Sequence, residues 1–181
     1  TESEFRDRIR RFRLGEISTD TVGWGSAMVD LDLDGKVDIC VANGSTLERK
    51  DDPTRLTPEP LFLFWRDGAE FHDLAPAAGA AASSLHDARG LAAADFDRDG
   101  DIDLAVTVNR GKLLLLRNET TISNRALRVR LKAPPAACFG ARIEMSAGGK
   151  SLFHWYAADA SYLSMHSTDA IFGLGEAEAA E

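Results

Sequence analysis

Short runs in which apolar and polar residues alternate make up most of the chain and predict strands rather than helices. The segments 37–41 and 102–106 place a β-branched residue or leucine at every second position. The segments 61–65 and 70–74 flank an Asp-Gly pair, which is typical of a hairpin turn, and the run 112–117 occupies the equivalent place later in the chain. The pattern therefore predicts an all-β fold.

The two ends of the chain differ from its middle. The spacing of Phe5, Ile9 and Phe12 predicts a short amphipathic helix in a helical or extended segment over residues 1–22, and we expect this helix to pack on the body of the protein. From Arg125 onward, alternation resumes, and a Gly-Gly pair within 147–150 marks a hairpin turn. A separate small β domain is expected at this end.

An internal repeat organises the middle of the chain. The segment from Gly25 to Asn43 is echoed by the segment from Gly90 to Asn109, at a period of 65 residues. In each copy a glycine stands five residues before the first aspartate, a run of small apolar residues leads in, and an alternating strand leads out. Two similar β units are therefore expected within residues 23–120.

Each repeat contains an acidic loop with aspartate at positions 1, 3, 5 and 9. Such a concentration of like charge needs a cation among the carboxylates. A glycine at position 6, Gly35 or Gly100, permits the sharp turn, and the carbonyl at position 7 can add an oxygen ligand. A set made only of oxygen atoms favours Ca²⁺ over zinc or copper, so we expect about two calcium ions. The predicted ligands are Asp30, Asp32, Asp34, Asp38 and the Lys36 carbonyl in the first loop, and Asp95, Asp97, Asp99, Asp103 and the Asp101 carbonyl in the second.

The EF-hand is the obvious alternative, because it shares the start of this pattern. It also needs a glutamate at position 12 and helices on both sides of the loop. Position 12 is Val41 in the first loop and Val106 in the second, and both loops lead into strands. We therefore expect rigid hairpin loops with a structural metal ion.

Composition and charge restrict the class of protein. The chain has 181 residues, 44% of them hydrophobic, and a formal net charge of -8. Without the eight aspartates at positions 1, 3, 5 and 9 of the two loops, the acidic residues would equal the 21 basic ones, so the net charge belongs to the repeats. An acidic protein without a long apolar segment is not expected to bind nucleic acid or to insert into a membrane.

The two cysteines do not identify the redox compartment. Cys40 lies in an apolar run and is expected to be a buried free thiol, whereas Cys138 lies in a segment that resembles a loop. The sequence leaves open whether the two are paired.

The repeats resemble the FG-GAP/VCBS-type blades of integrin-like β-propellers, in particular those of the cartilage acidic protein family, whose C-terminal domain is of the ASPIC/UnbV type. The segment from Gly23 to Gly44 is similar to a blade opening of that family, and the segment from Ala88 to Thr107, followed by residues 113–119, is similar to its last blade. The segments 139–151, 160–167 and 171–176 are similar to the ASPIC/UnbV signature. The resemblance implies about two blades within residues 23–120, not closed into a ring, followed by a small ASPIC/UnbV-like β domain over residues 121–181.

The chain also departs from that family, whose members have a full ring of blades and a longer C-terminal domain. We expect a fragment or shortened member, because two blades cannot form a ring and leave open sheet edges. Another protein chain or a second copy is expected to cover these edges. The resemblance implies a secreted, periplasmic or other cell-envelope location.

Three functions follow as hypotheses. The first is a non-catalytic, calcium-stabilised β-propeller-type interaction module. The second, which the occurrence of UnbV-like proteins beside biosynthetic machinery keeps open, is an enzyme or accessory protein in natural-product biosynthesis that uses a cleft between the blades and the C-terminal domain. A deep pocket lined by His154, Trp155, Tyr156 and Tyr162 would favour this hypothesis. The third is a structural subunit of a larger complex. The sequence offers no catalytic motif and no cofactor-binding residue, which favours a non-catalytic role and leaves the enzyme hypothesis open.

Overall fold

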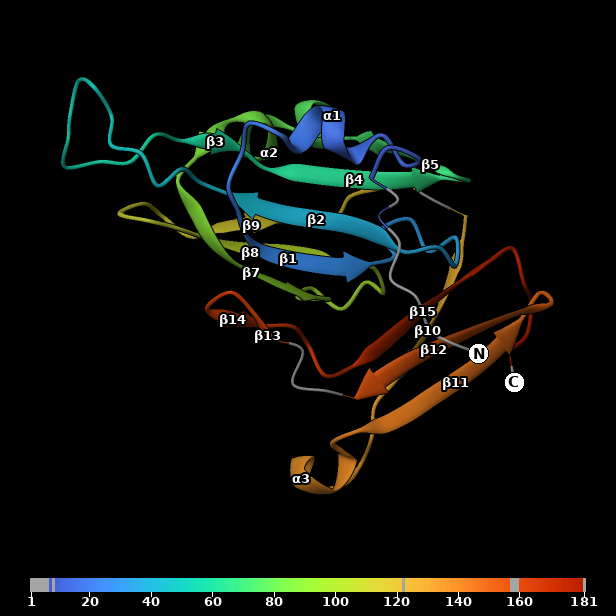
Figure 1. Cartoon of the computed structure of the whole chain (residues 1–181). Helices are drawn as coiled ribbons and strands as arrows, with labels where there is room; N and C mark the ends of the chain where they lie inside the picture. Colours follow the sequence, from blue (N-terminus) through green and yellow to red (C-terminus); the bar gives the residue numbers. More distant parts are fainter. Residues whose placement is uncertain (1–6, 8, 122, 157–159, 181) are drawn as a thin grey trace.

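The computed structural model describes residues 7, 9–121, 123–156 and 160–180, and it has the all-β architecture predicted above. The strands of the described residues form several small sheets, none of which closes into a barrel. Two sheets lie together, and the strands of the C-terminal region lie below them in Figure 1. Within the described part of the chain, no helix has the length and apolar character needed to span a bilayer.

The first sheet, which we call the first blade, is antiparallel and follows chain order from its inner to its outer strand. Ala27 pairs with Cys40, which pairs with Leu63. Gly68, at φ 58°, closes the outer hairpin at the predicted Asp-Gly turn. The strands are β1 (Gly23–Val29), β2 (Asp38–Asn43), β4 (Phe62–Asp67) and β5 (Glu70–Asp73).

The second sheet, the second blade, repeats this arrangement with one strand fewer. Ala92 pairs with Ala105, which pairs with Leu115, in the register of the first blade. Within the described residues, the strand that would correspond to β5 is missing. The strands are β7 (Ala88–Ala94), β8 (Asp103–Val108) and β9 (Leu114–Leu116). The 65-residue repeat is therefore a repeat of structure as well as of sequence.

The segment between the blades carries short elements that tie the two sheets together. After β5 the chain forms a 3₁₀ turn (Ala75–Ala77) and the one-turn helix α2 (Ala80–Ser83). The two-residue strand β6 (Leu85–His86) then pairs with β3 (Glu59–Pro60), which precedes β4.

The main core lies between the two blades and consists mostly of small and branched side chains. Cys40 is completely buried there as a free thiol, as predicted, and its burial raises the pKa of the thiol. Cys138 is also free and buried, so the structure contains no disulfide between them. The buried members of this core are Ala27, Cys40, Ala42, Leu61, Ala88, Leu91, Ala93, Ile102, Leu104 and Val106.

The N-terminal helix lies later in the chain than its predicted position. Helix α1 spans Leu14–Ser18, because Arg13 has a left-handed backbone, φ 58°, that separates the helix from the turns before it. Phe12 packs edge-on against Phe71 of β5, with ring centroids 5.7 Å apart, so this segment contacts the first blade. Phe5 lies outside the described residues.

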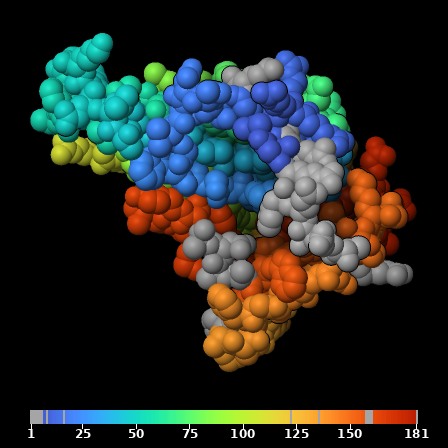
Figure 2. Space-filling view, viewed as in Figure 1, coloured from blue at the N-terminus to red at the C-terminus, as the bar shows by residue number. Residues whose placement is uncertain are grey.

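The segment 48–60, which carries three prolines and several charges, begins as an exposed hairpin. Arg49 N donates to the carbonyl of Arg55 (2.9 Å), and Thr57 N donates to that of Leu47 (2.8 Å). The teal part of the chain in Figure 2 shows this hairpin projecting from the body of the protein.

The C-terminal region forms two antiparallel pairs of strands around a small core of Met145, Ala170 and Phe172. Gly148 and Gly149, at φ 55° and 74°, form the two-residue turn between β11 and β12, as the Gly-Gly pair predicts. The elements are β10 (Arg125–Val129), α3 (Pro135–Cys138), β11 (Ala141–Ala147), β12 (Lys150–Tyr156) and β15 (Ala170–Gly175), with β10 pairing with β15 and β11 with β12.

Residues 160–167, which we call the inner-edge segment, lie along the inner strands of both blades. The segment includes β13 (Ala160–Ser161) and β14 (Ser164–Met165), which Figure 1 shows below β1 and β7. Its side chains accept hydrogen bonds from backbone amides of the inner strands, so the chain itself covers these two sheet edges. The bonds run from Ser26 N to Ser161 Oγ (2.7 Å), from Leu91 N to Ser164 Oγ (3.0 Å) and from Ala93 N to His166 Nδ1 (3.1 Å).

Removal of one such hydroxyl should destabilise the fold. Ser164 Oγ also donates to the carbonyl of Leu91 (2.9 Å), so Ser164→Ala leaves two backbone groups of β7 without a partner. We expect the free energy of unfolding to fall by about 1–3 kcal/mol in urea titrations. Ser151→Ala, on the exposed β11–β12 hairpin, should change it by less than about 0.5 kcal/mol. Equal effects of the two variants would contradict a role of Ser164 in covering the edge.

Candidate metal centre

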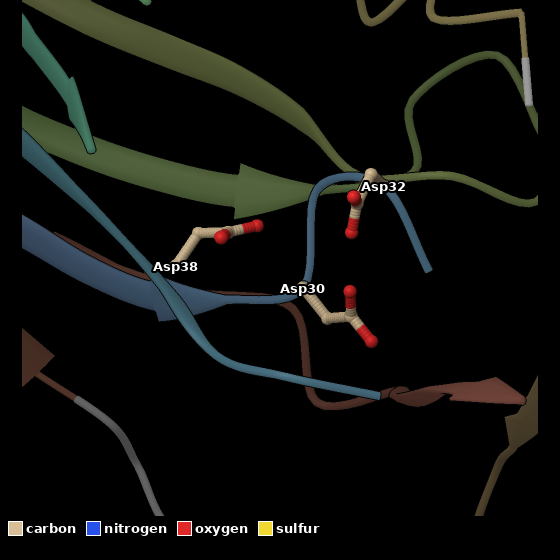
Figure 3. Close-up of side chains that lie close together, drawn as sticks. All are labelled: Asp30, Asp32 and Asp38. Carbon is tan, nitrogen blue, oxygen red and sulfur yellow. The ribbon is translucent and has the colours of Figure 1, made fainter. Parts of the chain in front are cut away.

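The first acidic loop connects β1 and β2 and folds its aspartates toward one another. The backbone takes left-handed conformations at Leu33 (φ 59°) and Gly35 (φ 81°), and Gly35 N donates to Asp30 Oδ2 (2.8 Å). Carboxylate oxygens of Asp30, Asp32 and Asp38 lie within 4.8 Å of one another (Figure 3). Three predicted ligands therefore form one cluster.

The second acidic loop, between β7 and β8, has the same backbone geometry. Arg98 and Gly100 are left-handed, at φ 68° and 111°, and Gly100 N donates to Asp95 Oδ2 (3.1 Å). Carboxylate oxygens of Asp95, Asp97 and Asp99 form the corresponding cluster within 4.8 Å. The two loops thus gather different members of the same pattern.

The residue at position 7 accounts for part of this difference. In the first loop it is Lys36, whose ammonium group forms an ion pair with Asp34, and Lys36 N also donates to Asp34 Oδ1 (2.7 Å). These contacts occupy the Asp34 carboxylate, which is not part of the cluster. In the second loop position 7 is Asp101, so the equivalent Asp99 has no such ion pair and lies in the cluster.

The aspartates at position 9 have a role that the sequence analysis did not assign. Asp38 accepts hydrogen bonds from Leu31 N and Arg66 N, each at 2.8 Å. Asp103 accepts in the same way from Phe96 N (2.9 Å) and Asn118 N (2.8 Å). Both residues are 1% exposed. Each carboxylate therefore connects the start of its loop to the outer part of its blade.

Burial makes the charged state of the first loop costly. Burial above all, and then the like charges of Asp34 and Asp32, raise the pKa of Asp30 to about 7, despite the hydrogen bond from Gly35. Burial likewise raises the pKa of Asp38 to about 6. In the second loop burial and the Asp99 carboxylate raise the pKa of Asp101 to about 7. Without a cation these loops hold carboxyl groups that resist ionisation near neutral pH.

Two buried carboxylate atoms of the second loop support a fit to a metal ion. Asp95 Oδ1 and Asp101 Oδ1 are buried and accept no hydrogen bond from the described residues. The Asp95 side chain is only 2% exposed. Unsatisfied oxygen atoms of this kind are costly unless a ligand contacts them. The donor set, which consists of carboxylates, suits a hard cation such as Ca²⁺.

The first loop is also the point at which the C-terminal region attaches to the blades. Four consecutive carbonyl groups of this loop accept hydrogen bonds from residues far along the chain. The donors are Asn118 Nδ2 to Leu31 (2.8 Å), Asn124 Nδ2 to Asp32 (2.7 Å), Gly175 N to Leu33 (2.9 Å) and Lys150 Nζ to Asp34 (3.4 Å). The conformation of this loop therefore fixes both the linker after β9 and the edge of β15.

Two further contacts restrict the first loop. A Cβ atom on Gly173 of β15 would lie 2.5 Å from the backbone carbon of Leu33 and would overlap the Asp30 carboxylate, so only glycine fits there. Trp65 of β4 donates from Nε1 to Asp32 Oδ2 (2.7 Å). The aspartate cluster is thus enclosed by β4 and β15.

The second loop carries a cation from the protein itself. Arg128 of β10 forms an ion pair with Asp95 Oδ2, and Arg117 donates to Asp97 Oδ2 (3.1 Å). Arg128 is therefore placed to compete with a metal ion for the Asp95 carboxylate. The sequence analysis missed Arg128, as well as the asparagines and Lys150 that contact the first loop, because these residues lie outside the repeat. Gly173 and Gly175, in the segment 171–176 that resembles the ASPIC/UnbV signature, were the available signal.

The raised pKa values predict how the stability of calcium-free protein depends on pH. Between about pH 4 and pH 7, Asp30 and Asp38 hold protons in the folded loop that the unfolded chain has released. The free energy of unfolding in chelator should therefore fall as the pH rises through this range. Urea titrations at pH 5, 6 and 7 measure this slope, and added calcium should remove it. A stability in chelator that is constant or rises with pH would contradict the expectation.

Replacement of Arg128 tests the competition at the second loop. Arg128→Gln removes the positive charge from Asp95, so the calcium affinity of this loop should rise by about tenfold, equivalent to about 1.4 kcal/mol. Calorimetric titration of calcium measures the change. Arg130→Gln is the matched control, because Arg130 pairs with Asp169 instead. Unchanged or weaker calcium binding in Arg128→Gln alone would show that Arg128 does not compete.

Comparisons with known proteins agree with this organisation. A family model described as FG-GAP-like repeat matches residues 30–106, which include both acidic loops. A model described as ASPIC and UnbV matches residues 132–181. No curated protein matches the chain. FG-GAP repeats are typical of extracellular or cell-envelope proteins. The chain therefore combines FG-GAP-like repeats with an ASPIC and UnbV domain, which is the architecture that the sequence resembles.

Proposed function

We propose that this chain is a non-catalytic, calcium-stabilised interaction module of the β-propeller type, secreted or located in the cell envelope. The two domains indicate a β-propeller-type interaction module. The proposal adds two Ca²⁺ sites, one in each acidic loop, and a structural role for the ions.

One observation carries the calcium proposal. Asp30, Asp32 and Asp38 are clustered in a loop of the first blade, and four carbonyl groups of this loop accept hydrogen bonds from the linker after β9 and from the C-terminal domain. Mutual repulsion of these carboxylates opposes that conformation, and a divalent cation among them would turn repulsion into attraction. Calcium would thus stabilise the loop on which the relative position of the two domains depends.

The residues proposed to hold the ions follow from the geometry. Asp30, Asp32 and Asp38 would hold calcium in the first loop, with Asp34 joining if it leaves Lys36. Asp95, Asp97 and Asp99 would hold it in the second, together with Asp101 through its unsatisfied side chain or its carbonyl group. In the first loop the carbonyl group of Lys36 would be a further ligand. In the second loop Asp103 would bind the ion through the lone pairs that its two hydrogen bonds leave free.

A pocket lined by His154, Trp155, Tyr156 and Tyr162 would favour the alternative of an enzyme, but these side chains do not line a common cavity. Trp155 is half exposed beside Arg142, and Tyr162 packs against Trp24 with the rings tilted by 51° and their centroids 4.7 Å apart. The cavity that His154 lines has a volume of about 180 Å³ and does not include these rings. Cavities that hold small-molecule ligands are usually larger, about 300–1,000 Å³. The interaction module is therefore the better supported function.

Calcium titration of chelator-treated protein tests the proposal. We expect calorimetry to detect about two ions, and the melting temperature to rise with calcium. Calcium at about one hundred times the dissociation constant should stabilise folding by about 2.7 kcal/mol per site. Asp32→Asn and Asp97→Asn should each remove one site, whereas Asp51→Asn, in the exposed hairpin, should remove none.

Terbium luminescence identifies the site that is lost. Trp65 contacts Asp32, so terbium bound in the first loop should be sensitised by this tryptophan. Asp32→Asn should abolish the signal, and Asp97→Asn should retain it. The proposal fails if folded, chelator-treated protein takes up no calcium and its melting curve does not change.

A further inference from the structure

The outer strand of the second blade lacks the neighbour that its counterpart has. Strand β4 pairs with β2 on one side and with β5 on the other. Strand β9 occupies the register of β4, with Leu115 in the place of Leu63, but among the described residues it pairs only with β8. Its second edge therefore exposes backbone groups of the kind that β5 satisfies in the first blade.

The side chains on and beside this edge are apolar. Four consecutive leucines occupy positions 113–116, and Leu113 and Leu115 are 63% and 60% exposed. Lys112 precedes them, and no carboxylate of the described residues pairs with it. An exposed apolar strand without proline is a site at which another strand can add.

A cavity adjoins the opposite face of β9. Its volume is about 660 Å³, and it lies between β4, β8, β9 and α2, with Leu63, Trp65, Ala82, Leu104 and Leu116 among its lining residues. Asn118, at its rim, already donates to Leu31 and accepts from Thr120. The polar rim is therefore satisfied within the protein, and the cavity suits an apolar side chain.

We propose that the free edge of β9 and this cavity form a docking site for an extended strand of another protein. The strand would pair antiparallel with β9, as β5 pairs with β4, and would place a large apolar side chain in the cavity. An acidic residue near Lys112 would complement its charge. Main-chain hydrogen bonds then supply affinity and the cavity supplies selectivity. This proposal rests on the proposed interaction module and names its binding surface.

The charge beside β9 favours a partner with an acidic residue over a second copy as the occupant. Arg117, at the far end of the strand, already pairs with Asp97 and Glu119, whereas Lys112 pairs with no carboxylate of the described residues. Residues 112–117 of a second copy contain no acidic side chain to place beside Lys112, whereas a heterologous strand can supply one.

A synthetic peptide of the sequence Glu-Phe-Thr-Phe-Thr-Phe-Glu, titrated against the whole chain with calcium present, tests the docking site. We expect the peptide to slow hydrogen exchange of the β9 amides that point away from β8, with the other strands unchanged. N-methylation of the peptide amides that would face β9 should weaken binding at least tenfold, which separates strand pairing from simple occupation of an apolar cavity.

Matched variants locate the site. Leu113→Lys combined with Leu115→Lys should weaken binding at least tenfold, whereas Leu47→Lys combined with Leu85→Lys should retain it, since Leu47 and Leu85 are 70% and 60% exposed elsewhere. Ala78→Phe, which fills the cavity rim, should also weaken binding, and its neighbour Ala77→Phe should not.

Three results would overturn the proposal: no protection of β9 amides at millimolar peptide, equal loss of binding in both leucine pairs, or a reversible dimer of the chain that the Leu113 and Leu115 substitutions abolish. Calcium titration of the same samples keeps the two proposals separate. Normal calcium uptake without peptide binding would refute the docking site alone.

Discussion

The rest of the structure depends on the enclosure of like-charged carboxylates in the first acidic loop. Asp30 is buried at the end of β1, and the backbone around it accepts hydrogen bonds from the linker, from β15 and from the β11–β12 hairpin. A loop that swings open to separate its charges would break these bonds. Electrostatic repulsion and domain attachment therefore oppose each other at one place, and a cation is the simplest way to relieve the repulsion while the attachment remains.

The two loops differ in which positive side chain of the protein contacts their clustered aspartates. In the first, Lys36 neutralises Asp34 at the rim, and no positive side chain of the described residues pairs with the buried cluster. In the second, Arg128 reaches the most buried aspartate from β10. Both loops are contacted by the C-terminal domain, one through backbone groups and the other through a charge. The domain thus acts as a structural complement of the acidic loops as well as a separate unit.

The sequence was sufficient to predict features that depend on local pattern. The repeat, the strands that follow each loop, the hairpin at Gly148 and Gly149 and the buried thiol of Cys40 all correspond to period-two alternation, turn residues or an apolar run. The predicted position of the N-terminal helix was wrong. The left-handed backbone at Arg13 separates the preceding turns from α1, so the helix begins only at Leu14. Periodicity alone does not reveal such a break.

Contacts between distant segments could not be predicted in the same way. Nothing in the local pattern of Ser161, Ser164 or His166 indicates that their side chains accept from amides more than 70 residues away. The second role of Asp38 and Asp103 is hidden for the same reason, since a position in an acidic loop explains these residues without reference to Arg66 or Asn118.

The two blades differ in how the chain covers the edges of their sheets. Two open blades have inner and outer edges, and the inner edges are covered by side chains of the inner-edge segment rather than by another strand. Side chains satisfy individual amides but do not extend the sheet, so this edge is closed to further pairing. In the first blade, β5 pairs with the outer side of β4, and Phe12 packs against β5.

The outer side of β9 has neither a pairing strand nor hydrogen-bonding side chains among the described residues, although Leu113 and Leu115 are largely exposed there. Because β4 has β5 beside it and β9 has no strand in that place among the described residues, the free edge of β9 is a specific difference between two otherwise equivalent repeats.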